Sequence, residues 1–202
     1  MRLTSAQIEL PAPRVTSSTS IEECLRARRS CRLFSGAPVR VADAAQLLWA
    51  AQGVTGFCGL RTAPSAGAVY PLVTYLIAMN VSGLKAGAYI YNPDDHAVTL
   101  HKAGGLRAKL LKAVFDQDEV ESAPLGILLC ALYRRSRRDF GEMGVRLADM
   151  EAGHAGQNVL LQAQALLLGA IGMGRMDNGA MRLALDIPEA EEPLYLLLAG
   201  AR

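Results

Sequence analysis

The strongest constraint on the fold is a segment without proline, rich in alanine and leucine, that runs from Arg146 to Leu168. At 1.5 Å per residue, this segment predicts a helix of about 34 Å. Gly153, Ala155 and Gly156 lie within it and are small, so another element can approach the helix closely. We therefore expect a central helix around which the remaining elements pack.

The other apolar segments are shorter and predict strands and helices in mixed order. Residues 72–80 and 125–133 have the pattern of strands buried on both faces, and residues 88–91 and 97–101 predict a hairpin. Ser20 and Glu23 form a capping box at the start of a helix. This mixture predicts the α+β class rather than regular βαβ alternation. The remaining elements are helices at residues 20–29, 41–52, 106–115 and 178–185 and strands at residues 170–173 and 194–199.

Charge and composition exclude several classes of protein. Twenty-one basic and nineteen acidic side chains leave a net charge of +2, too small a positive field for a general nucleic-acid or membrane-surface binder. The hydrophobic share of 51% excludes disorder of the chain as a whole. The longest apolar run, residues 159–173, contains two glutamines and is shorter than the roughly 20 residues that a bilayer requires. We therefore expect neither nucleic acid nor a membrane as a partner.

The cysteines and the N-terminus bear on location and domain organisation. The four cysteines form no CxxC pair and have no metal-type spacing, which indicates reduced thiols of a cytoplasmic protein. The N-terminus has no apolar run of signal-peptide length. Residues 1–19 contain two prolines and a Ser/Thr cluster, so we expect an extended arm followed by one domain at residues 20–202.

Residues 28–32, the arginine segment, are the densest functional signal. In extended backbone Arg28, Ser30 and Arg32 project to one side. Two guanidinium groups flanking a hydroxyl can bind a phosphate through charge-assisted hydrogen bonds. The alternative is a solvated basic helix end that complements the helix dipole.

Two further segments are rich in small residues. Residues 61–71, the small-residue loop, allow backbone to approach a flat ligand closely, and Ser65 offers a hydroxyl. Residues 169–177 form a glycine-rich turn whose N–H groups can donate to a ligand edge. Each segment is equally compatible with an ordinary connection between elements. Neither a Gly-Lys-Ser/Thr sequence nor a GxGxxG motif occurs, so the sequence supports neither a Walker nor a Rossmann nucleotide site.

Glu151, His154 and Asn158 share one face of the long predicted helix. The Glu-x-x-His spacing is that of half a di-iron site, but the sequence has no second copy and no matching carboxylates, so we expect no metal. The simpler interpretation is that these polar groups satisfy one another at a buried interface. No nucleophile motif accompanies His154.

Taken in order, these segments resemble the FMN-dependent nitroreductase superfamily, most closely its branch of SagB-type dehydrogenases, the relatives of azoline-forming oxidases. The resemblance covers nearly everything after residue 20. It implies a central, mostly antiparallel sheet flanked by helices, and an intertwined homodimer with the flavin at the subunit interface. The matching segments are residues 28–34, 47–53, 61–67, 153–158, 169–177 and 193–195.

The resemblance also implies roles for particular residues. Arg28 and Ser30 would hold the FMN phosphate and ribityl chain, and Arg32 would stabilise negative charge at flavin N1. Residues 65–67 would reach the flavin of the other subunit, and the Gly174 N–H would face N5. The cofactor-binding residues implied in this way are Arg28, Arg29, Ser30, Arg32, Ser65, Ala66, Gly67, Met173, Gly174 and Arg175.

Three departures from the family pattern concern substrate choice and cofactor retention. Asp139-Phe140 stands where azoline-forming relatives resemble one another in a Lys-Tyr pair, which argues against peptide azoline oxidation. Arg175 replaces a usual glycine and adds bulk or charge near the flavin edge. The chain ends at Arg202 without the basic tail that some relatives use to hold the phosphate, and Arg202 is a candidate substitute.

The expected function is an FMN-dependent oxidoreductase. Hydride would pass through flavin N5 from NAD(P)H to a small electron-poor acceptor such as a quinone or nitroaromatic. Hydride transfer requires no side-chain acid or base, so no catalytic side chain is assigned, and His154 and Asp139 are only candidates for proton delivery. The alternatives are a dehydrogenase of thiazoline or oxazoline peptides and a non-enzymatic flavin-binding module.

Overall fold

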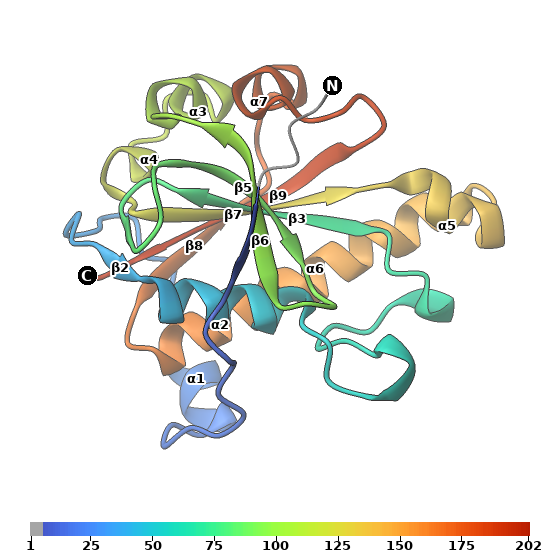
Figure 1. Cartoon of the computed structure of the whole chain (residues 1–202), viewed down its shortest axis with the longest axis horizontal. Coiled ribbons are helices and arrows are strands. Elements are labelled where there is room, and N and C mark those ends of the chain that lie inside the picture. Colours follow the sequence, from blue (N-terminus) through green and yellow to red (C-terminus); the bar gives the residue numbers. More distant parts are fainter. Residues whose placement is uncertain (1–5) are drawn as a thin grey trace.

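The computed structural model describes residues 6–202, which fold around one seven-stranded sheet (Figure 1). Its strand order is β1-β6-β5-β3-β7-β9-β8, and every neighbouring pair is antiparallel, as the resemblance implied. The strands are β1 (Gln7–Glu9), β3 (Leu72–Ala78), β5 (Gly87–Asn92), β6 (Ala97–Ala103), β7 (Leu125–Ala131), β8 (Gly169–Met173) and β9 (Glu192–Gly200). A separate parallel pair joins β2 (Val39–Arg40) to β4 (Val81–Ser82).

Helices cover both faces of the sheet (Figure 1). The long α6 (Met143–Ala165) lies beside α2 (Val41–Gln52) on one face, with α1 (Ile21–Ala27) outside them. The other face carries α3 (Arg107–Ala113), α4 (Glu119–Ser122) and α7 (Asn178–Leu185). Single 3-10 turns, η1 (Phe57–Gly59) and η2 (Ala66–Ala68), interrupt the connection from α2 to β3.

The central strand β7 shows why this arrangement buries a continuous apolar sequence. Alternate side chains such as Ile127 and Leu129 join the core formed with α2 and α6. Leu128 and Cys130 join the second core, formed with α3, α4 and α7. Every residue of β7 is buried, which explains the strand pattern without polar alternation.

The local signals at the helix starts were predictive. The Ser20 backbone N–H donates to Glu23 Oε2 at 2.8 Å, and the Glu23 N–H donates to Ser20 Oγ at 3.1 Å. The predicted helices at 41–52 and 178–185 match α2 and α7 residue for residue. Residues 6–19 of the predicted N-terminal arm contain no helix, and Gln7–Glu9 add to the sheet edge as β1 by pairing with β6. Residues 1–5 of the predicted arm lie outside the described residues.

The prediction was wrong where β7 ends. The strand stops at Ala131 instead of reaching Tyr133, and Tyr133 begins the helix α5 (Tyr133–Phe140), which was not predicted. The Tyr133 hydroxyl donates to Asp149 Oδ1 at 2.6 Å and so joins α5 to α6. Gly144 permits this packing, because an added Cβ would lie 2.6 Å from the Ser136 carbonyl carbon. The long helix α6 begins at Met143, three residues before its predicted start at Arg146.

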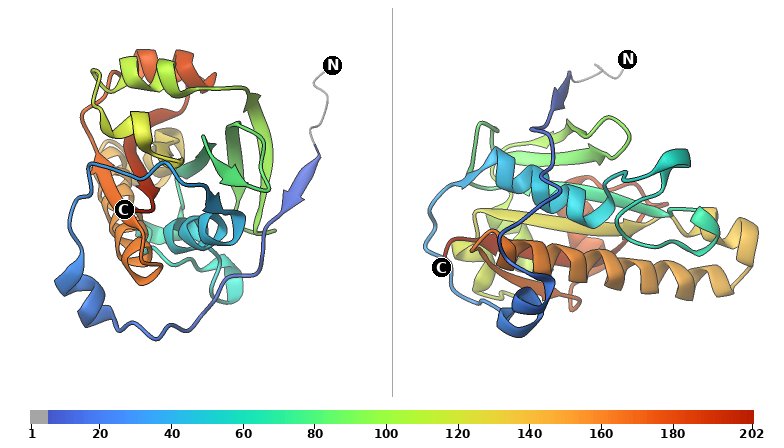
Figure 2. Two further views of the ribbon diagram at one scale, coloured as in Figure 1. Left: turned by 90° about the vertical axis from the view of Figure 1, so that its left-hand side faces the viewer. Right: turned by 90° about the horizontal axis from the view of Figure 1, so that it is seen from below.

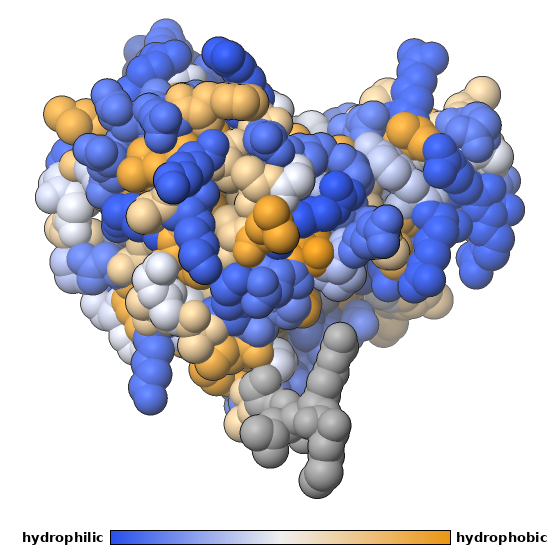
Figure 3. All heavy atoms as spheres, turned by 90° about the horizontal axis from the view of Figure 1, so that it is seen from above, coloured by the Kyte–Doolittle hydropathy of each residue, from blue (hydrophilic) through white to orange (hydrophobic). Residues whose placement is uncertain are grey.

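The two helical faces present different surfaces. Seen from above, over α3 and α7, hydrophilic residues predominate and hydrophobic ones are scattered among them (Figure 3). On the opposite side, α1 lies at the periphery of the molecule, outside α6 (Figure 2). No helix within residues 6–202 is long and apolar enough to cross a bilayer.

Candidate functional site

The arginine segment lies along the edge of β8. Ser30 forms a parallel bridge with Ala170, and the Cys31 N–H donates to the Ala170 carbonyl at 3.0 Å. Cys31 packs over Gly169, where an added Cβ would lie 2.5 Å from Cys31 Sγ. Because Cys31 faces β8, its neighbours Ser30 and Arg32 face away and are exposed. The segment is therefore extended with alternating directions, as the spacing predicts.

The arginines of this segment differ in their surroundings. Arg28 is partly buried, and its backbone N–H closes α1. Arg29 Nη1 donates to the carbonyl oxygens of Arg26 and Arg28 at 3.1 and 2.7 Å, so Arg29 does cap the helix end. Arg32 Nε lies 3.5 Å from Glu119 Oε1, and in this ion pair the arginine is exposed and the carboxylate is mostly buried. Arg28 is therefore better placed than Arg29 to hold an anion.

The C-terminal residue Arg202 lies beside the same strand edge. Its Cγ would be 3.1 Å from a Cβ added at Gly169, and its Nη2 donates to Gln164 Oε1 at 2.7 Å. Arg202 thus adds a further guanidinium next to Cys31.

The glycine turn, residues 173–175, follows β8. Met173 is buried, whereas Gly174 is exposed, and no described atom lies within 4 Å of a Cβ added at Gly174. The Arg175 guanidinium stacks over the Phe115 ring at 4.9 Å. Gln117 Nε2 donates to the Arg175 carbonyl at 3.4 Å. The Gly174 backbone is therefore accessible, and the Arg175 side chain is held to one side.

The small-residue loop is folded by its own hydrogen bonds. The Tyr70 N–H donates to Ser65 Oγ at 2.9 Å. Gly67 has a φ of +58°, and an added Cβ would lie 3.0 Å from Phe140 Cζ. The structure therefore places Phe140 directly over the loop. The Asp139-Phe140 departure adjoins the residues predicted to contact flavin.

A buried polar cluster lies beneath this loop. Gln52 Nε2 donates to Glu151 Oε1 at 3.4 Å, and Arg61 Nη1 donates to Gln52 Oε1 at 2.9 Å. The Arg61 guanidinium lies 4.5 Å from the centre of the Tyr70 ring. Burial raises the pKa of Glu151 and lowers the pKa of Arg61. We name Gln52, Arg61, Ser65, Tyr70 and Glu151 the Glu151 cluster.

Glu151 was expected to lie at a buried polar interface, but neither Gln52 nor Arg61 was expected to join it. Asn158 Nδ2 donates to the Thr62 carbonyl at 3.3 Å, so it also faces this loop. His154 is exposed instead. No short-range pattern in the sequence indicates that Gln52 and Arg61 join Glu151.

The two candidates for proton delivery differ in their environment. His154 lines a hollow of about 280 Å³ together with Ser65, Ala66 and Glu151. Asp139 is exposed and accepts from Arg138 Nε at 2.9 Å. This hydrogen bond lowers the pKa of Asp139 and favours its ionised form, so Asp139 is a poor proton donor. Within residues 6–202, no group of three or more His, Cys, Asp or Glu could hold a metal ion.

The strand β9 separates the arginine segment from the small-residue loop. Gly169, beside Cys31, pairs with Gly200 at one end of β9. Leu72 follows the loop and pairs with Ala131, which pairs with Glu192 at the other end. The nine residues of β9 span roughly 30 Å. One chain therefore presents the two groups at opposite ends of the sheet (Figure 1).

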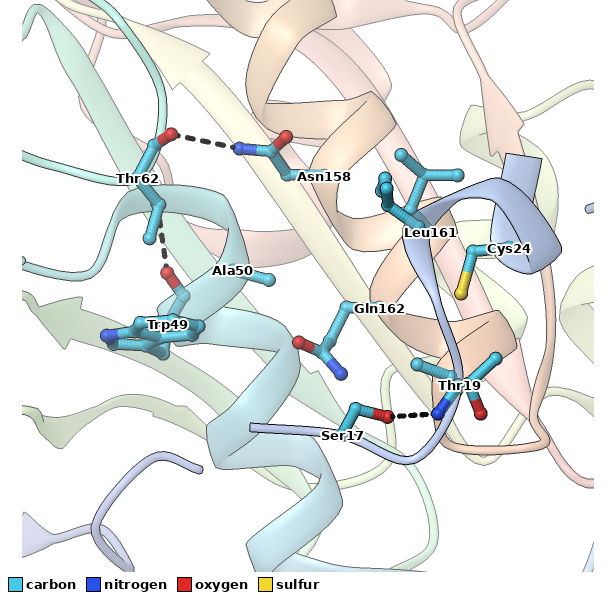
Figure 4. A pocket seen from close by; sticks show the side chains of 11 residues that line it. Ser17, Thr19, Cys24, Trp49, Ala50, Thr62, Asn158, Leu161 and Gln162 are labelled. Atoms are coloured by element: carbon cyan, nitrogen blue, oxygen red, sulfur yellow. Dashed lines mark hydrogen bonds between the residues drawn. The ribbon is translucent and has the colours of Figure 1, made fainter. Parts of the chain in front are cut away.

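A groove of about 280 Å³ lies between the N-terminal arm, α1, α2 and α6 (Figure 4). Ser17 and Cys24 line one side, and Trp49, Leu161 and Gln162 line the other. None of its lining residues belongs to the predicted cofactor set. The groove is thus distinct from the cofactor residues.

The family model for the nitroreductase family matches residues 25–201, and the chain belongs to this family. A protein of Methanocaldococcus jannaschii, described as a candidate nitroreductase, is 34% identical over 97% of this chain and 96% of its own. A candidate nitroreductase structure from Ralstonia eutropha has a TM-score of 0.84 at 28% identity, covering 96% of this chain and 89% of that one.

Two structures of lower identity share the fold. The microcin synthetase complex of E. coli gives a TM-score of 0.76 at 19% identity, covering 96% of this chain and 78% of that one. The NADPH:FMN oxidoreductase of Vibrio harveyi gives a TM-score of 0.63 at 18% identity, covering 90% of this chain and 68% of that one. The family assignment confirms the nitroreductase-like fold and a flavin-dependent oxidoreductase as the class of enzyme.

Proposed function

We propose that this chain is an FMN-dependent oxidoreductase that draws reducing equivalents from NAD(P)H and reduces a small electron-poor acceptor, such as a quinone or nitroaromatic. The observation that carries the proposal is the pairing of the arginine segment with β8. This pairing puts the exposed Ser30 and Arg32 along the edge of β8, and the exposed Gly174 turn follows the same strand. It supports the cofactor roles that the family resemblance implies.

The donor set fits FMN. Arg28 and Arg202 can bind the phosphate dianion, and the exposed Ser30 hydroxyl can bind the ribityl chain. Arg32 can stabilise negative charge on the pyrimidine edge, and the open Gly174 backbone can donate an N–H. When bound, FMN supplies a two-electron hydride carrier. The side chains supply binding, orientation and charge compensation.

A homodimer completes this site. Residues 65–67 lie at the opposite end of the sheet from the arginine segment, so a second copy would supply that loop. The exposed face of α6 is apolar enough for such contact, because Met143 and Met150 are 65% and 50% exposed. Ile21 and Leu25 of α1 are also exposed at the periphery. These features support an intertwined pair of subunits.

The alternative, dehydrogenation of a modified peptide, has less support. The microcin synthetase likeness, at 19% identity, concerns the fold alone. Asp139 is held ionised by Arg138, and Phe140 packs over Gly67. With its lowered pKa Asp139 is a weaker base than lysine, and Phe140 has no phenol, so the Lys-Tyr pair has no equivalent here.

Anaerobic stopped-flow absorbance at 450 nm tests the proposed function. Protein loaded with FMN should lose this absorbance on mixing with NADH or NADPH and regain it on mixing with a quinone. Loss driven only by a thiazoline peptide would favour the peptide dehydrogenase instead. Protein that stays colourless after incubation with FMN, and elutes as a monomer in light-scattering chromatography, overturns the proposal.

A further inference from the structure

The Glu151 cluster joins elements that are distant in the chain. Gln52 ends α2, Glu151 lies on α6, and Arg61 begins the small-residue loop between them. Gln52 bridges the other two, since its amide nitrogen donates to the carboxylate and its amide oxygen accepts from the guanidinium. The Gln52 amide therefore links the start of the loop to two core helices, in addition to the contacts that Thr62 makes with Trp49 and Asn158.

Burial and hydrogen bonding give Glu151 the central place in this cluster. Glu151 is 2% exposed and Gln52 is fully buried. The Nε of Arg61 is buried and has no hydrogen-bond partner among residues 6–202. The guanidinium is therefore held by Gln52 and the Tyr70 ring, with the negative charges of Asp94 and Glu151 acting on it. Removing the Glu151 side chain would leave the buried Gln52 amide without an acceptor for its N–H.

Hydrogen bonds carry this anchoring from Arg61 to the tip of the loop. The Arg61 N–H donates to the Tyr70 hydroxyl at 3.1 Å, which closes the loop at its base. The Tyr70 N–H donates in turn to Ser65 Oγ at 2.9 Å. The Ser65 hydroxyl also favours the ionised form of Glu151, so the chain of contacts returns to the carboxylate. Ser65, Ala66 and Gly67 are thus presented on a closed ring of side chains.

We propose that Glu151 is a positioning residue: it fixes the small-residue loop in the conformation that presents residues 65–67 to the cofactor of a second subunit. Glu151 acts through Gln52, Arg61 and Ser65 and does not itself contact the flavin. The consequence for FMN rests on the proposed function. The anchoring of the loop does not, and it can be tested without cofactor.

Limited trypsin digestion of the FMN-free protein tests the anchoring. Cleavage after Arg61 is followed by mass spectrometry, with cleavage after the exposed Arg138 as internal reference. Glu151→Ala should raise the relative rate at Arg61 at least tenfold. Glu151→Gln, which keeps the side-chain shape and an oxygen acceptor for Gln52, should stay within about threefold of wild type.

Two further variants keep this test decisive. Glu142→Gln neutralises an exposed carboxylate near the start of the same helix and should leave the rate unchanged. Gln52→Leu removes the bridging amide and should reproduce the effect of Glu151→Ala, so it decides the matter if Glu151→Ala does not fold. Wild-type rates at Arg61 in both Gln52→Leu and Glu151→Ala overturn the proposal.

Titration with FMN tests the consequence for the cofactor. Binding is followed by the change in flavin fluorescence on mixing, and Trp49, the single tryptophan, adjoins the loop because its carbonyl accepts from Thr62 Oγ1 at 3.0 Å (Figure 4). Glu151→Ala should raise the FMN dissociation constant about tenfold, and Glu151→Gln should restore most of the affinity. If a variant is cleaved faster after Arg61 but binds FMN with unchanged affinity, the positioning role is overturned. Wild-type protein that binds no FMN refutes the proposed function instead, while the digestion still reports on the anchoring.

Discussion

The arginine segment and the small-residue loop are held in place in different ways. The backbone of the arginine segment pairs with β8, and the side chains of Ser30 and Arg32 stay exposed. The small-residue loop is held by buried side chains, Gln52 and Glu151, that belong to other elements. Substitutions in the first region should therefore change ligand binding and leave stability intact. Substitutions in the second should change stability before any ligand is added.

The largest effect is expected for Arg61→Ala. It leaves the Glu151 carboxylate and the Gln52 amide buried without their partner, which should lower the free energy of unfolding by about 3 kcal/mol. Urea denaturation of the FMN-free protein measures this loss. Arg134→Ala, at an exposed position of α5, is the matched control and should have no effect. Equal midpoints for the two variants would contradict the buried anchor.

Arg28→Ala should show the opposite behaviour. Losing one charge-assisted phosphate contact should weaken FMN binding by about 1.5–3 kcal/mol. Thermal unfolding of the FMN-free protein should not change, because the backbone N–H that closes α1 remains. Arg26→Ala, an exposed arginine of the same helix, controls for loss of charge. FMN affinity equal to wild type would remove Arg28 from the phosphate site.

Arg32→Ala should have a smaller effect, on the flavin's redox potential more than on its occupancy. Removing a cation beside the pyrimidine edge should lower the midpoint potential of bound FMN. Arg32 forms an ion pair with Glu119, so removing that negative charge by Glu119→Gln should raise the midpoint potential. A spectroelectrochemical titration measures both shifts. Midpoints indistinguishable from wild type in both variants would refute this role.

The smallest expected effect is a pH dependence of stability that arises from the Glu151 carboxyl. Burial raises the pKa of Glu151 above its ordinary value of 4.5, so the folded state holds this proton more tightly than the unfolded chain. The resulting stabilisation is complete below the unfolded pKa and is lost as pH rises through the folded one. The stability of wild type relative to Glu151→Gln should therefore fall with rising pH in urea titrations. A pH-independent difference would show that the carboxyl pKa is not raised.

Local signals in the sequence predicted much of the fold and one of these two regions. Hydrophobic periodicity and the glycine stop at Gly53 placed α2, and the alternation of Arg28, Ser30 and Arg32 predicted an extended segment, although not its pairing with β8. Each of these signals spans only a few neighbouring residues. The end of β7 was missed because Leu132 extends the apolar run, while the contact that defines α5, from Tyr133 to Asp149, depends on tertiary packing.

The Glu151 cluster could not be assembled from the sequence. Gln52 and Glu151 are 99 positions apart, and neither belongs to a motif that indicates the other. Arg61 begins a loop of small residues, and nothing near it in the sequence indicates whether its guanidinium is exposed or buried. Which side chains share a buried space depends on how α2 and α6 pack, and single-sequence patterns do not encode that register.

The separation of the arginine segment from the small-residue loop along β9 has a genetic consequence. If two subunits exchange loops, a copy damaged at Arg28 and a copy damaged at Gly67 would each be inactive alone. When they are co-expressed, a dimer of one copy of each kind would combine one intact arginine segment with one intact small-residue loop. Such a dimer would have one active flavin site. Two defective alleles would then complement each other within one assembly.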